Sequence, residues 1–360
     1  MKRLIVLALL SVTLSAFGQP TPRLANAQAQ TMSAAAGLAK TIQPLVANAK
    51  GTTWIGYAVP TQSRSRYICC CADSMHDWGR NGGCTGGCRL DSDGGSFFNS
   101  NNGSCVSDQP QTHILVFLRV QAGKITQVRP FTPDCALDAK NLPVYWLTEI
   151  RDAESVEFLA SLIDGKNELA GFRSHHGALD AIALHKDASA DAKLESYLLP
   201  QSPAKLREQA AFWMGEERGH HGFEVLRQYI RNDKDSSFRN HLTFAISQSD
   251  DPEAVGELLR TAHQDASSQV RGQALFWLAQ KAGNKVAKDI GDAIDNDPDT
   301  DVKKKAVFAL TQMPENEGVP KLIEVASSNR NMVVRKEAIF WLGQSGDPRA
   351  LDYIEKLLLR

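Results

Sequence analysis

The residues best suited to chemistry in this 360-residue chain are its seven cysteines, none of which occurs after residue 141. They are Cys69, Cys70, Cys71, Cys84, Cys88, Cys105 and Cys135. Cys69 and Cys71 together with Cys84 and Cys88 supply four thiols at a spacing that suits zinc. A redox thiol is another alternative, although no Cys-x-x-Cys motif stands out. We favour disulfide bonds because the chain begins like an exported protein, and we assign no pairing.

The first 18 residues have the layout of a secretory signal peptide. Lys2 and Arg3 precede an apolar stretch, and Ala16 and Gly18 are the small residues that a signal peptidase reads. The stretch is shorter than the roughly 20 apolar residues that a membrane span needs. We therefore expect cleavage before Gln19 and a periplasmic or secreted mature chain without a membrane span.

Two vicinal histidine pairs, His175–His176 and His220–His221, are the other candidate metal ligands. Adjacent residues on a helix point about 100° apart, so each pair directs only one ring easily toward a shared ion. The sequence also lacks a nucleophile elbow, a zincin motif and a phosphate-binding loop. We therefore expect no catalytic residue, no metal site, no cofactor and no enzymatic activity.

The N-terminal part of the mature chain differs in composition from the rest. Residues 19–44 are rich in Ala, Gln, Thr and Pro, which is typical of a flexible linker. Residues 52–59, 113–120 and 124–128 have the character of strands, and a Gly-containing turn joins the last two. We expect residues 45–141 to form a small cysteine-rich, β-containing domain that disulfides hold together.

From residue 206 onward the sequence repeats every 32 residues without a gap. One column of the repeat is aromatic in each unit and consists of Phe212, Phe244, Phe276, Phe308 and Phe340. Apolar residues within each unit follow the i, i+3, i+4 spacing of helices, and weaker units extend back to residue 142. Because one helix pair cannot bury both of its faces, we expect about seven stacked pairs. The sequence thus predicts an all-α solenoid over 142–360.

Other columns predict how the units are built and stacked. Helix N-caps are expected at Asp235, Ser267, Asp299 and Asn331. A basic column consists of Arg207, Arg239, Arg271, Lys303 and Arg335. We expect it to pair with Asp233, Asp265 and Asp297 at the ends of neighbouring helices. The phenylalanine column and Trp213, Trp277 and Trp341 are expected in the core.

These columns resemble HEAT repeats, in particular the short HEAT-like repeats of phycobilisome lyases. The resemblance rests on the Leu/Val-Arg start of the units, on the Ala-x-Phe-Trp-Leu-Gly core that ends at Gly343, and on the turn from Gly346 to Ala350. Lys303 departs from the family's arginine. The resemblance implies scaffolding or protein recognition, and in some members chromophore attachment.

Candidate partner surfaces lie on the second helix of each unit and at the C-terminal end. The expected solvent-facing positions are Gln228, Arg260, Asp292, Glu324 and Lys356. Their mixed signs and the net charge of −1 argue against nucleic acid as a partner. Tyr353 and Leu359 widen the apolar stripe of the last unit, so this end could dock a partner or form a homodimer.

The sequence therefore favours an exported scaffold that presents a HEAT-like solenoid to a protein partner. Two alternatives stay open at this point. One is a lyase-type or enzyme-accessory protein, which the resemblance allows. The other is a metal or redox sensor that uses the cysteine-rich domain. Neither the partner nor the process follows from the sequence.

Overall fold

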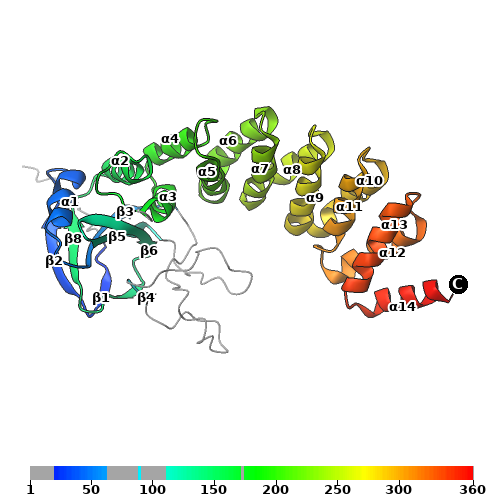
Figure 1. Ribbon diagram of the computed structural model, residues 1–360, viewed down its shortest axis with the longest axis horizontal. Coiled ribbons are helices and arrows are strands. Elements are labelled where there is room, and N and C mark those ends of the chain that lie inside the picture. Colours follow the sequence, from blue (N-terminus) through cyan, green and yellow to red (C-terminus); the bar gives the residue numbers. More distant parts are fainter. Residues whose placement is uncertain (1–19, 63–87, 91–110, 172–173, 360) are drawn as a thin grey trace, which may run out of the picture. The chain divides into compact units, whose positions relative to one another are not determined.

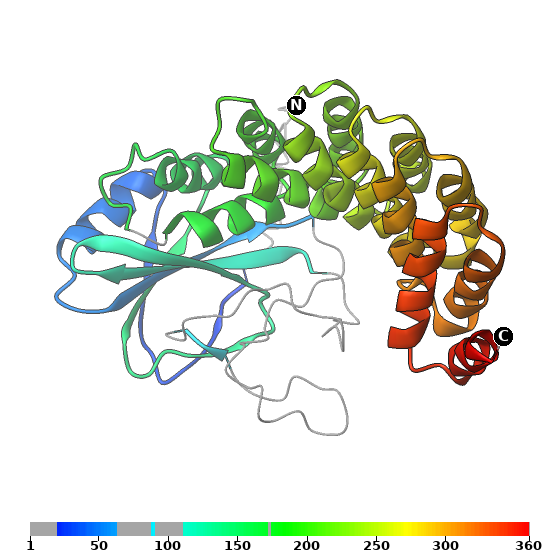
Figure 2. The same ribbon diagram turned by 45° about the vertical axis from the view of Figure 1, so that its right-hand side comes forward.

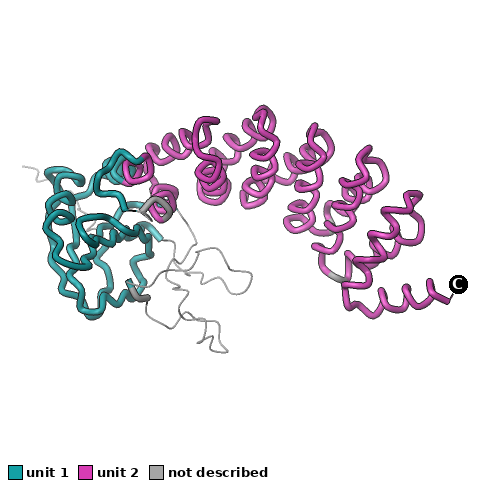
Figure 3. Tube along the Cα trace, in the orientation of Figure 1, with its two compact units in different colours: residues 1–158, 165–175 teal, residues 159–164, 176–360 magenta. Residues whose placement is uncertain are grey.

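A computed structural model describes residues 20–62, 88–90, 111–171 and 174–359. The chain forms two compact units, residues 1–158 with 165–175 and residues 159–164 with 176–360 (Figure 3). The predicted signal peptide and five of the seven cysteines lie outside the described residues.

Unit 1 is built on a five-stranded sheet in the order β2-β8-β3-β5-β6 (Figure 1). Its strands are β2 (Gln28–Ser33), β3 (Thr53–Pro60), β5 (His113–Gln121), β6 (Lys124–Phe131) and β8 (Pro143–Thr148). Strands β2, β8 and β3 run parallel, whereas β3, β5 and β6 are antiparallel. A smaller sheet has the order β1-β7-β4, with β1 (Arg23–Ala25), β4 (Cys88–Arg89) and β7 (Ala136–Asp138).

The predicted hairpin is confirmed as β5 and β6. Its turn passes through Ala122 and Gly123, whose φ angles are 50° and 71°. A tight hairpin turn of this hand needs positive φ at both central residues, which is why a glycine is favoured there.

The core of unit 1 lies on both faces of the five-stranded sheet. Trp54, Phe117 and Trp146 are buried on one face in a cluster that includes Leu137 of the smaller sheet. On the other face the buried Tyr57 hydroxyl accepts a hydrogen bond of 2.8 Å from Ser155 of α2 (Asp152–Ile163). Helix α1 (Leu38–Ala47) buries its apolar side, Leu38, Ile42 and Val46.

Unit 1 differs from the sequence prediction in two respects. The expected linker, 19–44, contains β1, β2 and the start of α1. All six residues of β2 are exposed, so the strand is held by its backbone pairing with β8 and shows no apolar alternation in the sequence. The expected boundary at 141 falls before β8, which pairs inside the sheet. The absence of cysteines after Cys135 reflects a change in composition, whereas the structural unit continues through β8.

Unit 2 is a row of stacked helix pairs (Figures 1 and 2). The pairs are α3 (Ser174–Leu184) with α4 (Ala188–Tyr197), α5 (Ala204–Glu217) with α6 (Gly219–Asn232), α7 (Ser236–Gln248) with α8 (Ala254–Gln264), α9 (Ser268–Ala282) with α10 (Ala287–Asn296), α11 (Thr300–Leu310) with α12 (Glu315–Ser328), and α13 (Met332–Gln344) with α14 (Pro348–Leu358). The first helices of successive pairs pack more closely against one another than the second helices do.

The 32-residue register is confirmed from α5 onward. Asp235, Asp299 and Asn331 each accept a hydrogen bond from the backbone N–H two residues on, as expected of N-caps. Ser267 occupies the same position without a side-chain bond. The described residues hold six helix pairs and not seven, because β8 and the single helix α2 occupy 142–173. No helix in the described ranges is long and apolar enough to cross a membrane.

Candidate functional site

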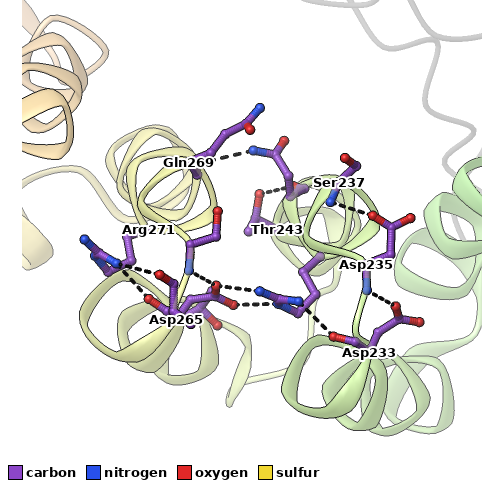
Figure 4. Close-up of polar contacts among 12 residues, drawn as sticks. Asp233, Asp235, Ser237, Thr243, Asp265, Gln269 and Arg271 are labelled. Atoms are coloured by element: carbon purple, nitrogen blue, oxygen red, sulfur yellow. Dashed lines mark hydrogen bonds and ion pairs between the residues drawn. The ribbon is translucent and has the colours of Figure 1, made fainter. Parts of the chain in front are cut away.

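The basic column joins neighbouring helix pairs, as the sequence predicts (Figure 4). Arg239 donates two hydrogen bonds, of 2.9 and 3.0 Å, to the carboxylate of Asp265. Arg271 does the same to Asp297 at 2.9 and 3.0 Å, and Arg207 binds Asp233 at 2.6 Å. Each of these ion pairs joins the first helix of a pair to the end of the second. The same arginines reach the preceding pair through a backbone carbonyl, Arg239 to Asp233 at 2.8 Å and Arg271 to Asp265 at 2.9 Å. These three arginines therefore have a structural role in stacking and are not free to bind an acidic ligand.

The column changes in its last two members. Lys303 binds a backbone carbonyl, that of Asp295, instead of a carboxylate. Arg335 binds the Asn329 carbonyl at 3.0 Å. Asn329 occupies the place that aspartate holds in the earlier units, and its side chain binds Asp295.

The first helices carry a continuous series of aromatic rings, which we call the aromatic ladder. Its members are Trp213, Phe212, Phe244, Trp277, Phe276, Phe308, Trp341 and Phe340. Phe212 stacks on Phe244 with centroids 5.7 Å apart. Phe276 stacks on Phe308 at 5.8 Å. Trp277 bridges the two stacks, with its centroid 4.8 Å from both Phe244 and Phe276.

The prediction that the phenylalanine column lies in the core is wrong. Phe212, Phe244, Phe276 and Phe308 are half-buried, and Phe340 is 55% exposed. Of the three tryptophans in the aromatic ladder, only Trp213 is buried. The column lies at the edge of the apolar face of each first helix, where a ring is covered by the next ring in the same column. Helical spacing alone cannot separate such an edge position from the core.

A row of glutamines runs beside the aromatic ladder, and sequence reasoning missed it. The amide row consists of Gln248, Gln280, Gln312 and Gln344. Each follows a ladder phenylalanine by four residues, which places the two side chains on the same helix face. Gln280 donates a hydrogen bond of 3.2 Å to the side-chain carbonyl of Gln312 in the next unit. The 32-residue spacing of these glutamines was the signal that could have found them.

The indole N–H groups of the ladder have different partners. Trp213 donates to Asp180 at 3.1 Å, and Trp341 donates to Glu337 at 2.9 Å. The Trp277 N–H is buried without an acceptor among the described residues. Asp180 stands where later units carry phenylalanine. Burial raises the pKa of Asp180 to about 7, although the hydrogen bond from Trp213 lowers it.

The second-helix positions face solvent but make no common surface. Gln228, Asp292, Glu324 and Lys356 are exposed, and Arg260 is half-buried. Three of them bind a residue on their own helix, Arg260 to Glu257, Glu324 to Lys321 and Lys356 to Asp352. A hollow of about 180 Å³ between α10 and α12 includes Asp292 and Glu324, together with lysines. The charges of this row compensate one another.

The C-terminal pair exposes apolar side chains. Leu359 is 80% exposed, as is Leu358. Tyr353 is half-buried, and its hydroxyl lies 3.3 Å from that of Ser327 on α12. Tyr353 therefore folds against the preceding pair, whereas Leu359 does not.

The candidate metal ligands do not converge in the described part of the chain. The Nδ1 atom of His220 lies 2.7 Å from a carboxylate oxygen of Asp251, and the Nε2 atom of His221 lies 2.8 Å from a carboxylate oxygen of Glu195. No group of three or more metal-ligating side chains occurs among the residues that the structure describes. The side chains of His175 and His176 lie outside them. Cys135 is buried in the core of unit 1 and is disulfide-bonded. The pairing of the seven cysteines stays a prediction.

Comparison with known proteins identifies the repeats. None of the curated proteins matches the chain. Residues 287–360 match the family described as HEAT repeats. Among solved structures, human deoxyhypusine hydroxylase in complex with glycerol is 17% identical with a TM-score of 0.31, and the likeness covers 58% of this chain and 80% of that one.

Two bacterial structures are similar to a comparable degree. YibA of Escherichia coli is 20% identical with a TM-score of 0.36, over 53% of this chain and 71% of that one. The complex of CpcE and CpcF of phycocyanin lyase from Nostoc is 16% identical with a TM-score of 0.30, over 57% of this chain and 81% of that one. At these values they assign no activity or partner to this chain.

One prediction needs correction at this point. The expectation that the chain is not an enzyme is contradicted, because the similar structures include two enzymes, the hydroxylase and the lyase. That expectation rested on the absence of three catalytic motifs from the sequence, and one fold can host chemistries that use none of them. The resemblance to HEAT repeats, by contrast, is confirmed by the match of residues 287–360 to that family.

Proposed function

We propose that the chain is an exported scaffold that binds a protein partner along the first helices of its HEAT-like row. The observation that carries this proposal is the aromatic ladder. It continues over five successive units and leaves all its rings except Trp213 half-buried or exposed. Aromatic side chains are enriched at protein interfaces, and contiguous exposed apolar surface is uncommon on monomers.

The row of second helices supports the same choice by contrast. Many of its charges are paired, either within one helix or with the next unit, so a partner would have to separate them. Rim charges of this kind add little to affinity. The first helices carry aromatic rings and neutral amides, which bury at a lower cost in desolvation.

Export is supported by the basic start, apolar stretch and small residues of the first 18 residues. An oxidising compartment also agrees with Cys135, which is disulfide-bonded in the core of unit 1. We place the mature protein in the periplasm or outside the cell. The exposed apolar side chains of α14 support a further contact at the C-terminal end, with a second copy.

Site-specific photocrosslinking in the native cell envelope tests the scaffold proposal. A photoreactive residue replaces Gln280 on the first helices or, as a control, the exposed Gln228 on a second helix. We expect a protein crosslink from position 280 that is absent at position 228. The crosslink should weaken in Phe308→Ala/Phe340→Ala and persist in Leu351→Ala/Leu358→Ala. Equal crosslinking from both positions would contradict binding along the first helices.

A further inference from the structure

The aromatic ladder and the amide row together form a surface, here called the stripe. On α7 and α9 the polar side chains four residues from Phe244 or Phe276, or three residues before either ring, carry no formal charge: Asn240, His241, Gln248, Gln273 and Gln280. A lysine of the next unit, Lys305, lies against Gly272 of α9. Burial lowers the pKa of His241, which keeps that ring neutral. The nearby Lys281 ammonium donates hydrogen bonds to the backbone carbonyls of Ser247 and Ser249 at 2.9 and 2.8 Å. Charge complementarity therefore favours a neutral ligand.

The rings offer their edges and not their faces. Phe212 lies against Phe244 at an interplanar angle of 16°, and Phe276 lies against Phe308 at 7°, so these faces cover one another. A sugar ring stacks on a free aromatic face, and in these two pairs the facing sides of the rings are not free. Ring edges carry partial positive charge and contact both apolar groups and carbonyl oxygens. Apolar side chains and peptide carbonyls suit such edges.

The amide row supplies hydrogen-bonding partners that can replace the water which a peptide backbone loses on binding. A glutamine amide has two donor hydrogens and an acceptor oxygen. The bond from Gln280 to Gln312 uses one donor of the first and one lone pair of the second. Gln248 and Gln312 each donate to the hydroxyl of the preceding residue, Ser247 or Thr311, at 2.9 Å. Donors and acceptors thus remain at regular intervals along the row.

The spacing of the stripe suits an extended chain. Stacked rings are 5.7 and 5.8 Å apart. In an extended polypeptide, side chains on the same face recur about every 6.8 Å. Alternate side chains of one strand can therefore lie on the two rings of a stacked pair while its backbone faces the glutamines.

From these observations we infer that the stripe binds an extended, uncharged polypeptide segment with apolar side chains at alternate positions, and that the amide row bonds to its backbone. The inference rests on the proposed function, since it names the chemistry of the partner at the same surface. A folded partner domain would contact the aromatic ladder but would have no free backbone for the amide row to bind.

Peptide display on the purified mature chain provides the probe. Random peptides of about 12 residues span about 40 Å when extended, enough for several ladder rings. We expect enrichment of uncharged sequences with apolar residues at i and i+2. Fluorescence anisotropy should then show roughly tenfold weaker binding of the best peptide to Gln280→Leu/Gln312→Leu. Binding to Gln228→Leu, the matched control on a second helix, should be unchanged.

Backbone methylation separates backbone contacts from side-chain contacts. A peptide with the same side chains but alternate N-methylated amides should bind the wild type roughly tenfold more weakly. It should lose no further affinity in the double glutamine variant, because the two changes remove the same bonds. Circular dichroism checks that each variant folds.

Three results would overturn the inference. One is enrichment of charged peptides, another is unchanged affinity in the double glutamine variant, and the third is failure to enrich any peptide. The scaffold proposal would survive each of them if photocrosslinking from position 280 still captured a protein. Loss of that crosslink would overturn the scaffold proposal itself.

Discussion

Asp265 shows how one carboxylate sets the stacking of two helix pairs. Its side chain is 7% exposed, receives two bonds from Arg239 and caps the Ser267 N–H. Burial, the largest single influence, raises the pKa of Asp265. The hydrogen bonds from Arg239 and the Ser267 N–H, together with the charges of Arg239 and Arg260, outweigh burial, so the pKa is lowered from its ordinary value of 3.8. Because the pKa of Asp265 is lower in the folded than in the unfolded chain, its carboxylate stabilises the folded state above pH 3.8. This stabilisation is lost as the pH falls below that value and the carboxylate takes up a proton.

We therefore expect Asp265→Asn to lower the free energy of unfolding by about 2–3 kcal/mol at neutral pH, because Arg239 loses a charged partner while remaining mostly buried. Urea unfolding at neutral pH and again below pH 3.8 measures the change, and the gap between variant and wild type should narrow in acid. The exposed pair of Glu324 with Lys321 is the control. Glu324→Gln should cost less than about 1 kcal/mol. Equal costs for the two variants would contradict the structural role of the column.

Asp180 is predicted to have the opposite effect on the pH dependence of stability, because its pKa is raised in the folded state and not lowered. Its folded pKa, raised by burial to about 7, means that the folded state holds a proton that the unfolded state releases above its ordinary value of 3.8. Stability from this group is therefore present below pH 3.8 and is lost as the pH rises toward about 7. Asp180→Asn, which keeps an acceptor for Trp213, should raise the melting temperature at a pH above 7.

Tryptophan fluorescence reports the same titration, because the Trp213 indole donates to Asp180. The wild type should show a transition near pH 7 that is missing in Asp180→Asn. His185, whose pKa burial lowers to about 4, titrates in a different range and serves as an internal reference. A fluorescence transition that persists in Asp180→Asn would assign it to another group.

At the scale of the helix, two glycines in the same column of the repeat differ in what surrounds them. A Cβ on Gly215 of α5 would lie 2.0 Å from the Ala245 carbonyl oxygen of α7, whereas a Cβ on Gly343 of α13 meets only Ile354 at 4.0 Å. Gly215→Ala should therefore destabilise by about 1–3 kcal/mol, because the two helices must move apart. Gly343→Ala should stabilise by about 0.5–1 kcal/mol through helix propensity alone. Thermal unfolding of both variants measures this difference, and the same sign in both would contradict the close approach of α5 to α7.

Sequence periodicity identified the helix pairs because every unit repeats the same physical requirement. Leu242, Ala274 and Ala306 must be buried against both neighbours, so the column is apolar in each unit and the register follows. Periodicity failed for the aromatic ladder, because the burial of Phe276 depends on the ring of the next unit and not on its own helix face. The amide row was missed because its 32-residue spacing was read only for apolar and basic columns, although Gln248, Gln280, Gln312 and Gln344 share that spacing. Strand β2 was missed because backbone groups make its pairing with β8, and its exposed side chains show no alternation from which a strand could be predicted.

At the scale of the whole molecule, the row of pairs is held by contacts between neighbours, so each pair owes its stability to the pairs beside it. In the middle of the row Leu242 and Leu278 are fully buried. Along α14 only Ala350 is buried. Apolar surface that interior pairs cover is thus left uncovered on the last one.

This difference leads to a prediction about self-association. Apolar side chains exposed on the last pair include Met332, Val333, Phe340, Leu351, Leu358 and Leu359. Burying such a patch against its copy across a two-fold axis would remove it from water on both chains at once. We expect light scattering with size-exclusion chromatography to show a dimer that forms with rising concentration. Tyr353→Glu/Leu359→Lys should keep the chain monomeric, since a charge would enter the contact from each side.

The control for this experiment separates the contact from the packing of α14 on α12. Tyr353→Glu also removes the hydroxyl that lies 3.3 Å from Ser327, so a loosened helix could abolish a dimer indirectly. Tyr353→Phe removes only that hydroxyl, and Leu358→Lys changes a side chain that is 80% exposed and leaves Tyr353 in place. A dimer through this end requires that Tyr353→Phe still associates and that Leu358→Lys does not. A wild-type chain that stays monomeric at every concentration would contradict a homodimer through this end.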